Sequence, residues 1–507
     1  MLGMIMAIID STIVNVALDA MAGNLGTSID EVSWVVTAYI LATVVVMPLN
    51  GFLTALLGRK LYYAVSICVF TISSFLCGTA HSLGALIFYR VIQGIGGGAL
   101  QPTAQAILFE SYPAGRRGQA MAIFGIGAMF GPAIGPTLGG YIVDNFTWPL
   151  IFLINLPIGI VALMMTLAYV PDPHYIKRTK AEHLDWLGLA AMTAGLASLQ
   201  YVLERGQHDD WFNSNTIIFL TTTAAVGLAV FIWRQLTVEH PLVDLRVFRH
   251  RSFTAGNVLI VITGFGLFGT ALILPLFFQT LLRFDAFQTG MALMPGAIAT
   301  AVAMPIAGRL TDKIDGRIPV LFGMLLFGLS TWWMGSLNQN AGYWDVFWPR
   351  VWQGFSLAFI FVPLSTLTMG AVGRAETANA SGIYNLLRQL GGSLGIAALT
   401  TILSRDQTAN YQSLSTGVTL SHPSVRQAVD QMTQLLVAQG HTFFEAQRLA
   451  LLELANTVLS NAMTIAYDDL FRLSAVVFFA AAPLILLLKR PDRPTRSAAL
   501  HSRGSHP

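Results

Sequence analysis

The sequence predicts an all-α polytopic membrane protein made of two six-helix halves with two further helices inserted between them. Three observations predict this class: the composition, the spacing of apolar runs and an internal repeat. The 507 residues are 54% hydrophobic and only 11% charged, with a mean hydropathy of +0.62, whereas soluble domains average roughly 25% charged residues. The composition therefore excludes an ordinary soluble domain, and the net charge of +3 is too small to indicate nucleic-acid binding.

Apolar runs long enough to span about 30 Å of hydrocarbon recur along the whole chain. The first is short, and Met1 opens directly into it without a charged leader, which is compatible with a native start further upstream. A signal peptide is disfavoured there, because Asp10 lies in the middle of the run and a basic segment is missing. We count fourteen predicted spans, at about 1–18, 34–57, 61–80, 84–108, 118–141, 148–170, 184–203, 214–235, 254–282, 287–308, 318–337, 345–370, 377–403 and 466–488.

An internal repeat relates the two ends of the chain. The segment RVIQG at 90–94 returns as RVWQG at 350–354, and GFLTALLGRK at 51–60 has a looser echo in GRLTDKIDGR at 308–317. Both copies keep the same sidedness, which indicates a parallel repeat about an axis along the membrane normal. The predicted units are a first half at 1–170, an inserted pair with its loops at 171–253, a second half at 254–488 and a tail at 489–507. Convergent loop chemistry is the alternative explanation of the repeat.

The basic residues of the loops predict the orientation. With both termini inside, the cytoplasmic loops and tail collect most of the arginines and lysines, and the opposite loops hold few. This asymmetry follows the positive-inside rule and supports an even number of spans. One long loop, at about 405–465, lies on the outer side. His422 and Pro423 open one helix that Gly440 stops, and Thr442 with Glu445 forms the capping box of a second helix that continues into the last span. This hairpin either shields the outer mouth or docks a partner protein.

Several polar groups lie inside predicted spans, where a charge is costly and indicates function. Asp10 lies roughly mid-depth in the first span, and Arg90 with Gln93 lies in the fourth. A long arginine side chain can cover the roughly 6 Å of helix rise between the two charges. A desolvated carboxylate close to a guanidinium can load and release a proton. The alternative is a static buried ion pair that only fixes helix packing. Glu110 and Asp144, at the ends of spans, are expected to be solvated.

The fifth predicted span carries a ladder of small residues on one face. Its glycines recur at every fourth position, and two prolines interrupt the same helix, so we expect this face to pack closely against a moving partner helix. The residues are Gly127, Gly131, Pro132, Gly135, Pro136 and Gly139.

Polar and aromatic side chains on spans expected to face the central axis predict a substrate cavity. A cavity with many aromatic and few charged groups suits amphipathic compounds, although any one of these aromatic side chains is more often plain packing. The predicted cavity residues are Asn15, Tyr39, Gln101, Phe130, Phe265, Arg388 and Gln389.

Four motifs resemble the major facilitator superfamily, and in particular its fourteen-span drug:proton antiporters of the EmrB/QacA type. DSTIVNVA at 10–17 is similar to the first-span signature, 51–60 to the loop between spans two and three, 90–98 to the fourth-span motif, and 127–140 to the antiporter motif of the fifth span. The resemblance runs through the whole chain and is closer to the EmrB branch, which also carries a long outer loop before its last span. One departure is Ala55, where the family usually has Asp; Asp312 supplies the acid in the second half.

The resemblance implies a proton-driven multidrug efflux antiporter of the bacterial inner membrane, working by alternating access. Asp10 would carry the coupling proton and Arg90, held by Gln93, would tune it. Gln93, Gly94, Asp312 and the fifth-span ladder would form motif and gating positions. The implied partners are small amphipathic drugs, membrane lipid, an EmrA-type periplasmic membrane-fusion protein and a TolC-type outer-membrane channel. No cofactor is implied beyond protons as the coupling ion.

Other functions are less compatible with the sequence. The phosphate-binding pattern G-x-x-x-x-G-K-[ST] of ATP-driven pumps does not occur. No span pairs two histidines at a metal-binding spacing, which disfavours an enzyme. An importing symporter of the same fold, an exporter of an endogenous metabolite or siderophore, and a non-transporting scaffold or sensor remain as alternatives. Dye accumulation with and without a protonophore would separate export from import and from neither.

Overall fold

The computed structural model describes residues 1–175, 179–180, 184–419 and 421–489, and these form helices and loops without a strand. It contains 14 helical segments long and apolar enough to cross a membrane, so the predicted fold class is confirmed. The helices are α1 (Leu2–Leu25), α2 (Ile29–Val32), α3 (Trp34–Val46), α4 (Asn50–Leu57), α5 (Arg59–Gly78), α6 (Leu83–Ser111), α7 (Arg117–Asn145), α8 (Leu150–Leu153), α9 (Asn155–Tyr169), α10 (Trp186–Arg205), α11 (Asn215–Thr237), α12 (Arg251–Leu276), α13 (Ala286–Lys313), α14 (Arg317–Met334), α15 (Tyr343–Gly370), α16 (Thr377–Gly417), α17 (Pro423–Ala438) and α18 (Phe443–Ala481).

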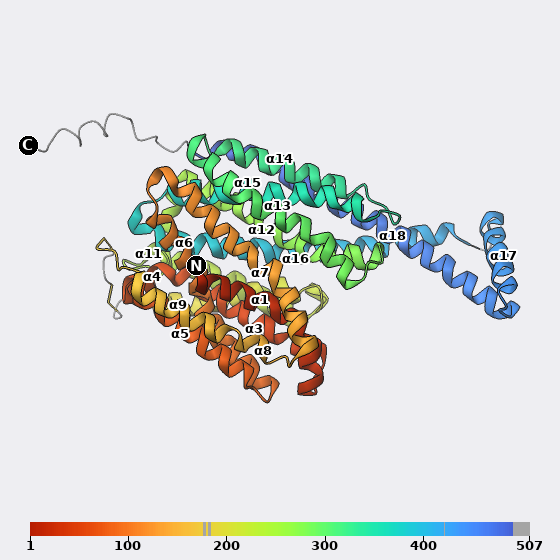
Figure 1. Ribbon diagram of the computed structural model, residues 1–507, viewed down its shortest axis with the longest axis horizontal. Helices are drawn as coiled ribbons and strands as arrows, with labels where there is room; N and C mark the ends of the chain where they lie inside the picture. Colours follow the sequence, from red (N-terminus) through yellow and green to blue (C-terminus); the bar gives the residue numbers. More distant parts are fainter. Residues whose placement is uncertain (176–178, 181–183, 420, 490–507) are drawn as a thin grey trace, which may run out of the picture.

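The helices pack as two bundles with matching contacts. In the first half α1 packs on α7 and α3 on α6, and in the second half α12 packs on α16 and α13 on α15. In the ribbon view most of the first half lies below the second half, and α6 and α7 lie between them (Figure 1). Across the boundary α7 packs on α13, and α16 packs on α4 and α6. These equivalent pairings agree with a parallel repeat.

The inserted helices lie beside both halves. α10 packs against its partner α11 and also contacts α3 of the first half and α16 of the second. The amide of Gln200 on α10 donates to the hydroxyl of Ser393 on α16 at 2.7 Å. The guanidinium of Arg205, at the end of α10, donates to the hydroxyl of Ser33 at 2.7 Å. Hydrogen bonds therefore tie the inserted pair to each half separately.

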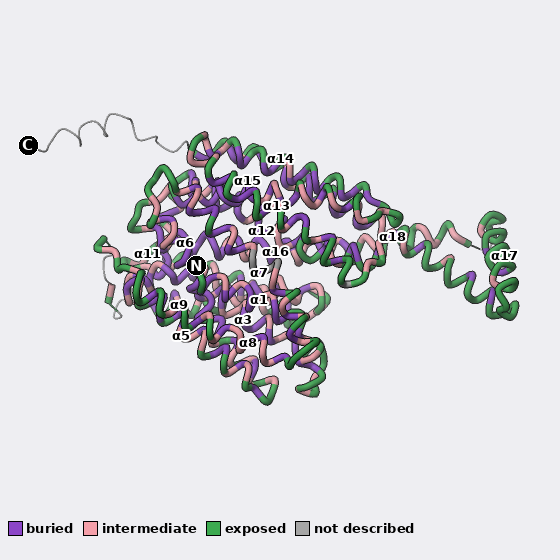
Figure 2. The backbone as a smooth tube through the Cα atoms, in the orientation of Figure 1, coloured by how far each residue is buried: buried purple, intermediate pink, exposed green. Residues whose placement is uncertain are grey.

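The two ends of the bundle differ in charge and shape. We call the end that carries Arg59, Arg116 and Arg374 the basic end, and the opposite end, from which α17 projects, the hairpin end (Figure 1). Buried residues concentrate in the helical body, whereas the hairpin is largely exposed (Figure 2). The spans thus enclose a packed interior with one projecting element.

The hairpin confirms the prediction for the outer loop and corrects its boundary. α17 begins with Pro423 at its first position, and Gly440 after it has φ +101°. Thr442 and Glu445 form the predicted capping box of α18, which runs unbroken for 39 residues. α16 does not end near residue 403 as expected but continues to Gly417. The polar run after Ser404 has no Gly or Pro until Gly417, so nothing in its backbone stops the helix.

The first span is longer than the sequence indicated. α1 covers 24 residues, from Leu2 to Leu25, and ends at Gly26 in the left-handed conformation with φ 65°. The apolar run in the sequence predicts an end near residue 18. Asp19 is exposed at the hairpin end, where water solvates its carboxylate. The helix can therefore continue past the charge to a glycine cap.

Candidate functional site

The Asp10 carboxylate lies inside the first half in a closed hydrogen-bonding network. Its Oδ2 accepts from Nη1 of Arg90 at 2.6 Å. Its Oδ1 accepts from Nε2 of Gln93 at 2.9 Å and from Nδ2 of Asn155 at 2.8 Å. All four side chains are at most 1% exposed. Hydrogen bonds between charged partners at this length are the strong ones, so the network fixes the position of the carboxylate.

The network is positioned by five elements of the first half. Arg90 also donates through Nη1 to Oε1 of Gln93 at 2.7 Å and through Nε to the carbonyl of Val35 on α3 at 3.0 Å. The ring of Tyr39 lies 4.2 Å from its Cζ, and that of Phe152 on α8 lies 5.6 Å away. The Arg90 Nη2 atom is buried without a hydrogen-bond partner among the described residues. The predicted contact between Asp10 and Arg90 is thus present and sealed from water; the proton-coupling role of the pair stays a prediction.

Asn155 is a member of this network that the sequence did not reveal. It is the first residue of α9, is 1% exposed, and also donates to the Ser74 hydroxyl at 3.0 Å. Ser74 in turn donates to the carbonyl of Phe152 at 2.9 Å. The available signal was an isolated Asn in an otherwise apolar run, where an unpaired amide would be costly. The sequence did not indicate which charge that amide meets.

The glycine ladder of α7 packs against α1. The backbone of Ile13 lies within 3.0 Å of the position that a Cβ at Gly139 would occupy. Gly127 meets Met1, Met4 and Ile5, Gly131 meets Ile8, and Gly135 meets Thr12. Thr12 donates to the carbonyl of Gly131 at 3.1 Å. The partner of this face is therefore the Asp10 helix of the same half. Pro136 is exposed, and the side chains of Phe130 and Pro132 lie outside the described part of the chain.

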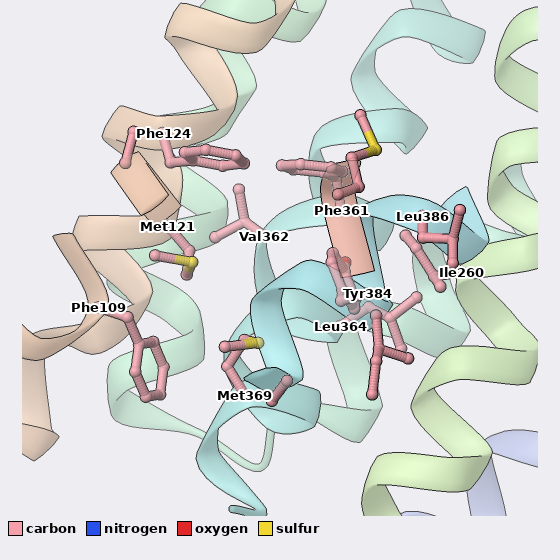
Figure 3. Close-up of a cluster of buried hydrophobic side chains, with 14 of the residues drawn as sticks. Phe109, Met121, Phe124, Ile260, Phe361, Val362, Leu364, Met369, Tyr384 and Leu386 are labelled. Atoms are coloured by element: carbon pink, nitrogen blue, oxygen red, sulfur yellow. The ribbon is translucent and has the colours of Figure 1, made fainter. Parts of the chain in front are cut away.

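The two halves meet at and near the basic end through polar and aromatic contacts. The amide of Asn50 on α4 donates to the carbonyl of Ala378 on α16 at 2.7 Å, and its Oδ1 accepts from Thr103 at 2.6 Å. The rings of Phe124 on α7 and Phe361 on α15 stack at 6.1 Å with an 8° interplanar angle. Figure 3 shows these two rings facing each other across the boundary. The basic end is therefore closed in this conformation.

Asp312 at the end of α13 joins this closure. Its Oδ1 accepts from the backbone N–H of Gly118 at 2.7 Å, and its Oδ2 accepts from the backbone and side chain of Gln119 at 3.3 and 3.2 Å. Both donors lie in the first turn of α7, where the helix dipole also favours an anion. Ala55, at the equivalent position of the first half, has no carboxylate to make such a contact. We call the contacts of Asp312 with Gly118 and Gln119 the latch. The latch is present in the second half and has no equivalent at Ala55 in the first half.

Glu110 contradicts the expectation that it is solvated. Its carboxylate pairs with the Arg59 guanidinium at 2.8 Å, and the side chains are 7% and 6% exposed. The pair joins α5 to the end of α6 at the basic end. The span boundaries predicted from the sequence did not indicate that Arg59, at the start of α5, would lie beside Glu110. Asp144 is exposed, as expected.

The predicted cavity residues do not share one environment. Asn15 is exposed, whereas Gln101, Phe265 and Gln389 are half-buried. Tyr39 is 4% exposed and belongs to the Arg90 surroundings described above. Gly94, predicted as a gating position, lies so close to α3 that a Cβ would meet the Tyr39 carbonyl and the Ala42 Cβ at 2.5 and 2.7 Å. Gly94 therefore permits the close packing of α6 on α3.

Arg388 lies at the boundary between the halves. It is 4% exposed, and its Nη2 donates to Oδ1 of Asn385 at 3.3 Å. Asn385 donates through Nδ2 to Oε1 of Gln105 on α6 at 2.6 Å. The Cζ of Arg388 lies 5.7 Å from the centroid of the Phe361 ring. No ion pair links Arg388 to a carboxylate among the described residues.

At the hairpin end a histidine links the inserted pair to the first half. His208, in the loop after α10, contacts Asp209 at 2.9 Å and Asp30 at 3.2 Å. The hydrogen bond to Asp209, followed by the charge of Asp30, raises the pKa of His208 above its usual value of 6.5. We find no cluster of potential metal ligands within the described ranges.

Comparisons with known proteins agree with this architecture. The multidrug export protein EmrB of Escherichia coli K12 is 34% identical over 487 residues, covering 96% of this chain and 93% of that protein. The fatty acid resistance protein FarB of Neisseria gonorrhoeae is 32% identical over 490 residues, covering 97% and 95%. Among solved structures, the xylose:proton symporter XylE, as a double tryptophan mutant, matches with a TM-score of 0.59 at 14% identity, covering 96% and 97%.

The match to a family model completes the assignment. The model described as Major Facilitator Superfamily matches residues 1–396, and this range holds all four motifs on which the resemblance was based. Together with the relatives that share about a third of their residues over nearly the full length, it confirms the predicted family. This chain belongs to the major facilitator superfamily.

Proposed function

We propose that this protein is a proton-driven multidrug efflux antiporter of the bacterial inner membrane, exporting amphipathic hydrophobic compounds by alternating access. The observation that carries the proposal is the Asp10 network, an acid held away from water among spans α1, α6 and α9. A buried ionisable group of this kind marks a proton or ion pathway. EmrB, by its name, exports multiple drugs, and the shared length supports the same activity here.

Protonation of Asp10 would change the forces between helices. The neutral carboxyl no longer attracts Arg90, and it must turn one oxygen from acceptor to donor. The guanidinium then holds an uncompensated charge in the interior, which favours a rearrangement of α6 relative to α1. Because α1 packs on the α7 ladder and α7 packs on α13 of the second half, such a shift can reach the boundary between the halves. The coupling route therefore runs from the carboxylate through α7.

The experiment compares wild-type protein with Asp10→Asn in proteoliposomes carrying a pH gradient. Asparagine retains the shape of the side chain but cannot bind a proton, so we expect drug-dependent proton movement to fall to background. Insertion and thermal unfolding in detergent confirm that the variant is folded. Asp19→Asn, the same change at an exposed site of α1, is the control and should transport normally. Exchange by Asp10→Asn at the wild-type rate would reject the proposal.

The hairpin supports a second part of the proposal, a periplasmic partner. It projects from the bundle (Figure 1) and exposes Phe443, Phe444 and Leu452 at 69%, 79% and 50%. A groove of about 320 Å³ lies beside them, lined by Phe444, Gln447, Arg448, Leu451 and Leu452. We propose that a membrane-fusion protein docks here and connects the antiporter to an outer-membrane channel, because water-exposed aromatic clusters mark protein contacts.

Co-purification tests the docking surface. The double substitution Phe443→Ser with Phe444→Ser should abolish co-purification with a co-expressed EmrA-type protein, whereas Asp10→Asn should preserve it. Unchanged recovery of the double variant would place the interface elsewhere. We also propose that the basic end faces the cytoplasm, because the arginine-rich loops lie there and the positive-inside rule favours that side.

A further inference from the structure

Arg388 is a buried cation whose charge nothing in the described chain neutralises. Its Nε is buried without a hydrogen-bond partner among the described residues, and the hydrogen bond that its Nη2 donates to Asn385 is long at 3.3 Å. Arginine stays protonated under essentially all conditions. An uncompensated charge in a low-dielectric interior is strongly unfavourable, by several kcal/mol. An anion placed beside this guanidinium would compensate its charge.

Two other arginines inside the spans have different partners. Arg90 is neutralised by Asp10. Arg350, half-buried at the repeated position, is like Arg388 without a carboxylate partner among the described residues, but it donates to Gln353 and to the carbonyl of Leu293 at 3.4 Å, and both belong to its own half. Arg388 alone of the three is linked to the opposite half, through Asn385 and Gln105. A ligand at Arg388 would therefore act on the contact between halves.

The surroundings of Arg388 are apolar and aromatic. Phe361 lies 5.7 Å from its Cζ and stacks on Phe124 of α7. Figure 3 shows Met121 and Val362 close to this pair of rings. A molecule with a negative head and an apolar body would place the head on the guanidinium and the body among these side chains once the halves separate.

We propose that Arg388 binds the negatively charged group of a transported amphipathic anion and that this binding releases the Asn385–Gln105 contact. When the anion takes over Nη2, Asn385 Oδ1 loses its charged donor. Hydrogen bonds in a chain strengthen one another, so this loss weakens the bond from Asn385 Nδ2 to Gln105. The anion therefore unlocks one polar contact between the halves as it binds. This inference rests on the proposed transport function and names the substrate class for it.

Equilibrium binding to purified protein tests the recognition step. The probes are 12-(dansylamino)dodecanoate and its methyl ester, which differ in charge but share the apolar chain. The wild type should bind the carboxylate on the order of 10-fold more tightly than the ester, as a charge-assisted bond requires. Arg388→Gln should remove this preference and leave ester binding unchanged, while Arg388→Lys should retain part of it.

Arg350→Gln is the matched control, because it makes the same change at a half-buried arginine of α15 that is bonded within its own half. It should keep the wild-type preference for the carboxylate. Ester binding reports whether Arg388→Gln is folded. If Arg388→Gln binds neither ligand, the decision falls to Arg388→Lys, which should bind the ester and retain part of the preference for the carboxylate. Equal carboxylate affinity in the wild type and in Arg388→Gln would overturn the inference.

The unlocking step is measured by electron–electron resonance between spin labels at Gly115 and Gly373. Both are exposed in loops at the basic end, one on each half, and the background carries Cys68→Ser and Cys77→Ser. The carboxylate should lengthen the distance in the wild type and not in Arg388→Gln; no change in the wild type would reject the unlocking. Ligand binding and the spin-label distance can be measured in protein that does not transport. These results therefore keep their meaning even if the protein shows no proton-driven export. Normal export with unaltered Arg388→Gln binding would instead reject only the inference.

Discussion

Asp10 shows what single residues contribute to this protein. A charge in the middle of an apolar run indicates a functional group, and a cation on another span indicates its partner. The sequence could not indicate the remaining partners, the accepting carbonyl of Val35 and the donating amide of Asn155, because a backbone carbonyl carries no sequence signal and an isolated amide has many possible neighbours. The role of Tyr39 in a substrate cavity stays a prediction. Its ring lies over Arg90, where a cation–π contact stabilises the buried charge.

The Asn155 contact gives a prediction at this scale. Asn155→Ala removes a donor to a buried carboxylate, so we expect it to lower the free energy of unfolding by roughly 1–3 kcal/mol. Thermal or denaturant unfolding in detergent measures this loss. Ser73→Ala is the control, because the Ser73 hydroxyl bonds only to carbonyls of its own helix and its removal should change stability little. Equal effects of the two substitutions would argue against a specific role of Asn155.

At the scale of elements, the helices and their caps follow local rules, whereas their partners do not. The capping box at Thr442 and the proline at the start of α17 are local signals and were read correctly. The α7 ladder indicated close packing, but the spacing of its glycines could not indicate that α1 is the helix that fills it. The same uncertainty applied to Glu110, whose partner Arg59 is 51 residues away.

The α7 ladder predicts a sharp difference between neighbouring glycines. A Cβ at Gly135 would overlap the Thr12 hydroxyl, whereas at Gly140 the nearest atom, in Val16, is 3.9 Å away. Gly135→Ala should therefore force α7 from α1 and destabilise the protein by about 1–3 kcal/mol, with a parallel loss of export. Gly140→Ala should be close to wild type in both assays. Comparable loss in both variants would show that the face is not specifically packed.

The inserted pair predicts a pH-dependent link at the hairpin end. The pKa of His208 is raised by Asp209 and Asp30, so the stabilisation is fully present below the usual histidine pKa of about 6.5 and is lost as the pH rises through the raised value. The difference in melting temperature between wild type and His208→Ala should thus be larger at pH 5.5 than at pH 8.5. The difference should be small, because the side chain is exposed. A pH-independent difference would contradict the ion pair.

At the scale of the whole molecule, closure of the basic end combines contributions from both halves. Asp312 holds the first turn of α7, Asn50 holds α16, and Phe124 stacks on Phe361. The repeat predicted two equivalent units, yet the acid occurs in only one of them. The opening of this end therefore depends on the Asp312 latch, whose acid the sequence identified, and on the Asn50 and Phe124 contacts, which the sequence did not indicate.

The latch yields a prediction for the conformational balance. Asp312→Asn replaces an ionised acceptor of the α7 N–H groups by a neutral one, so we expect the basic end to open more often. Labelling of a cysteine placed in that boundary, from the basic side, should be faster than in the wild-type background. Asp285→Asn makes the same change at the opposite end of α13, where asparagine also caps helices well, and should leave labelling unchanged. Slower labelling in Asp312→Asn would reverse the assignment.

The sequence by itself determined the number of spans, the internal repeat, the helical hairpin before the last span and the presence of an acid and a cation within the spans, and its charge asymmetry predicts the orientation. Each of these follows from hydrophobic length, charge asymmetry or local capping, which act along the chain. Only the tertiary structure decided which groups surround Asp10, which helix fills the α7 ladder and which buried arginine is linked to the opposite half through Asn385 and Gln105. Those outcomes depend on the relative depth and rotation of helices far apart in sequence, and packing across the bundle sets both.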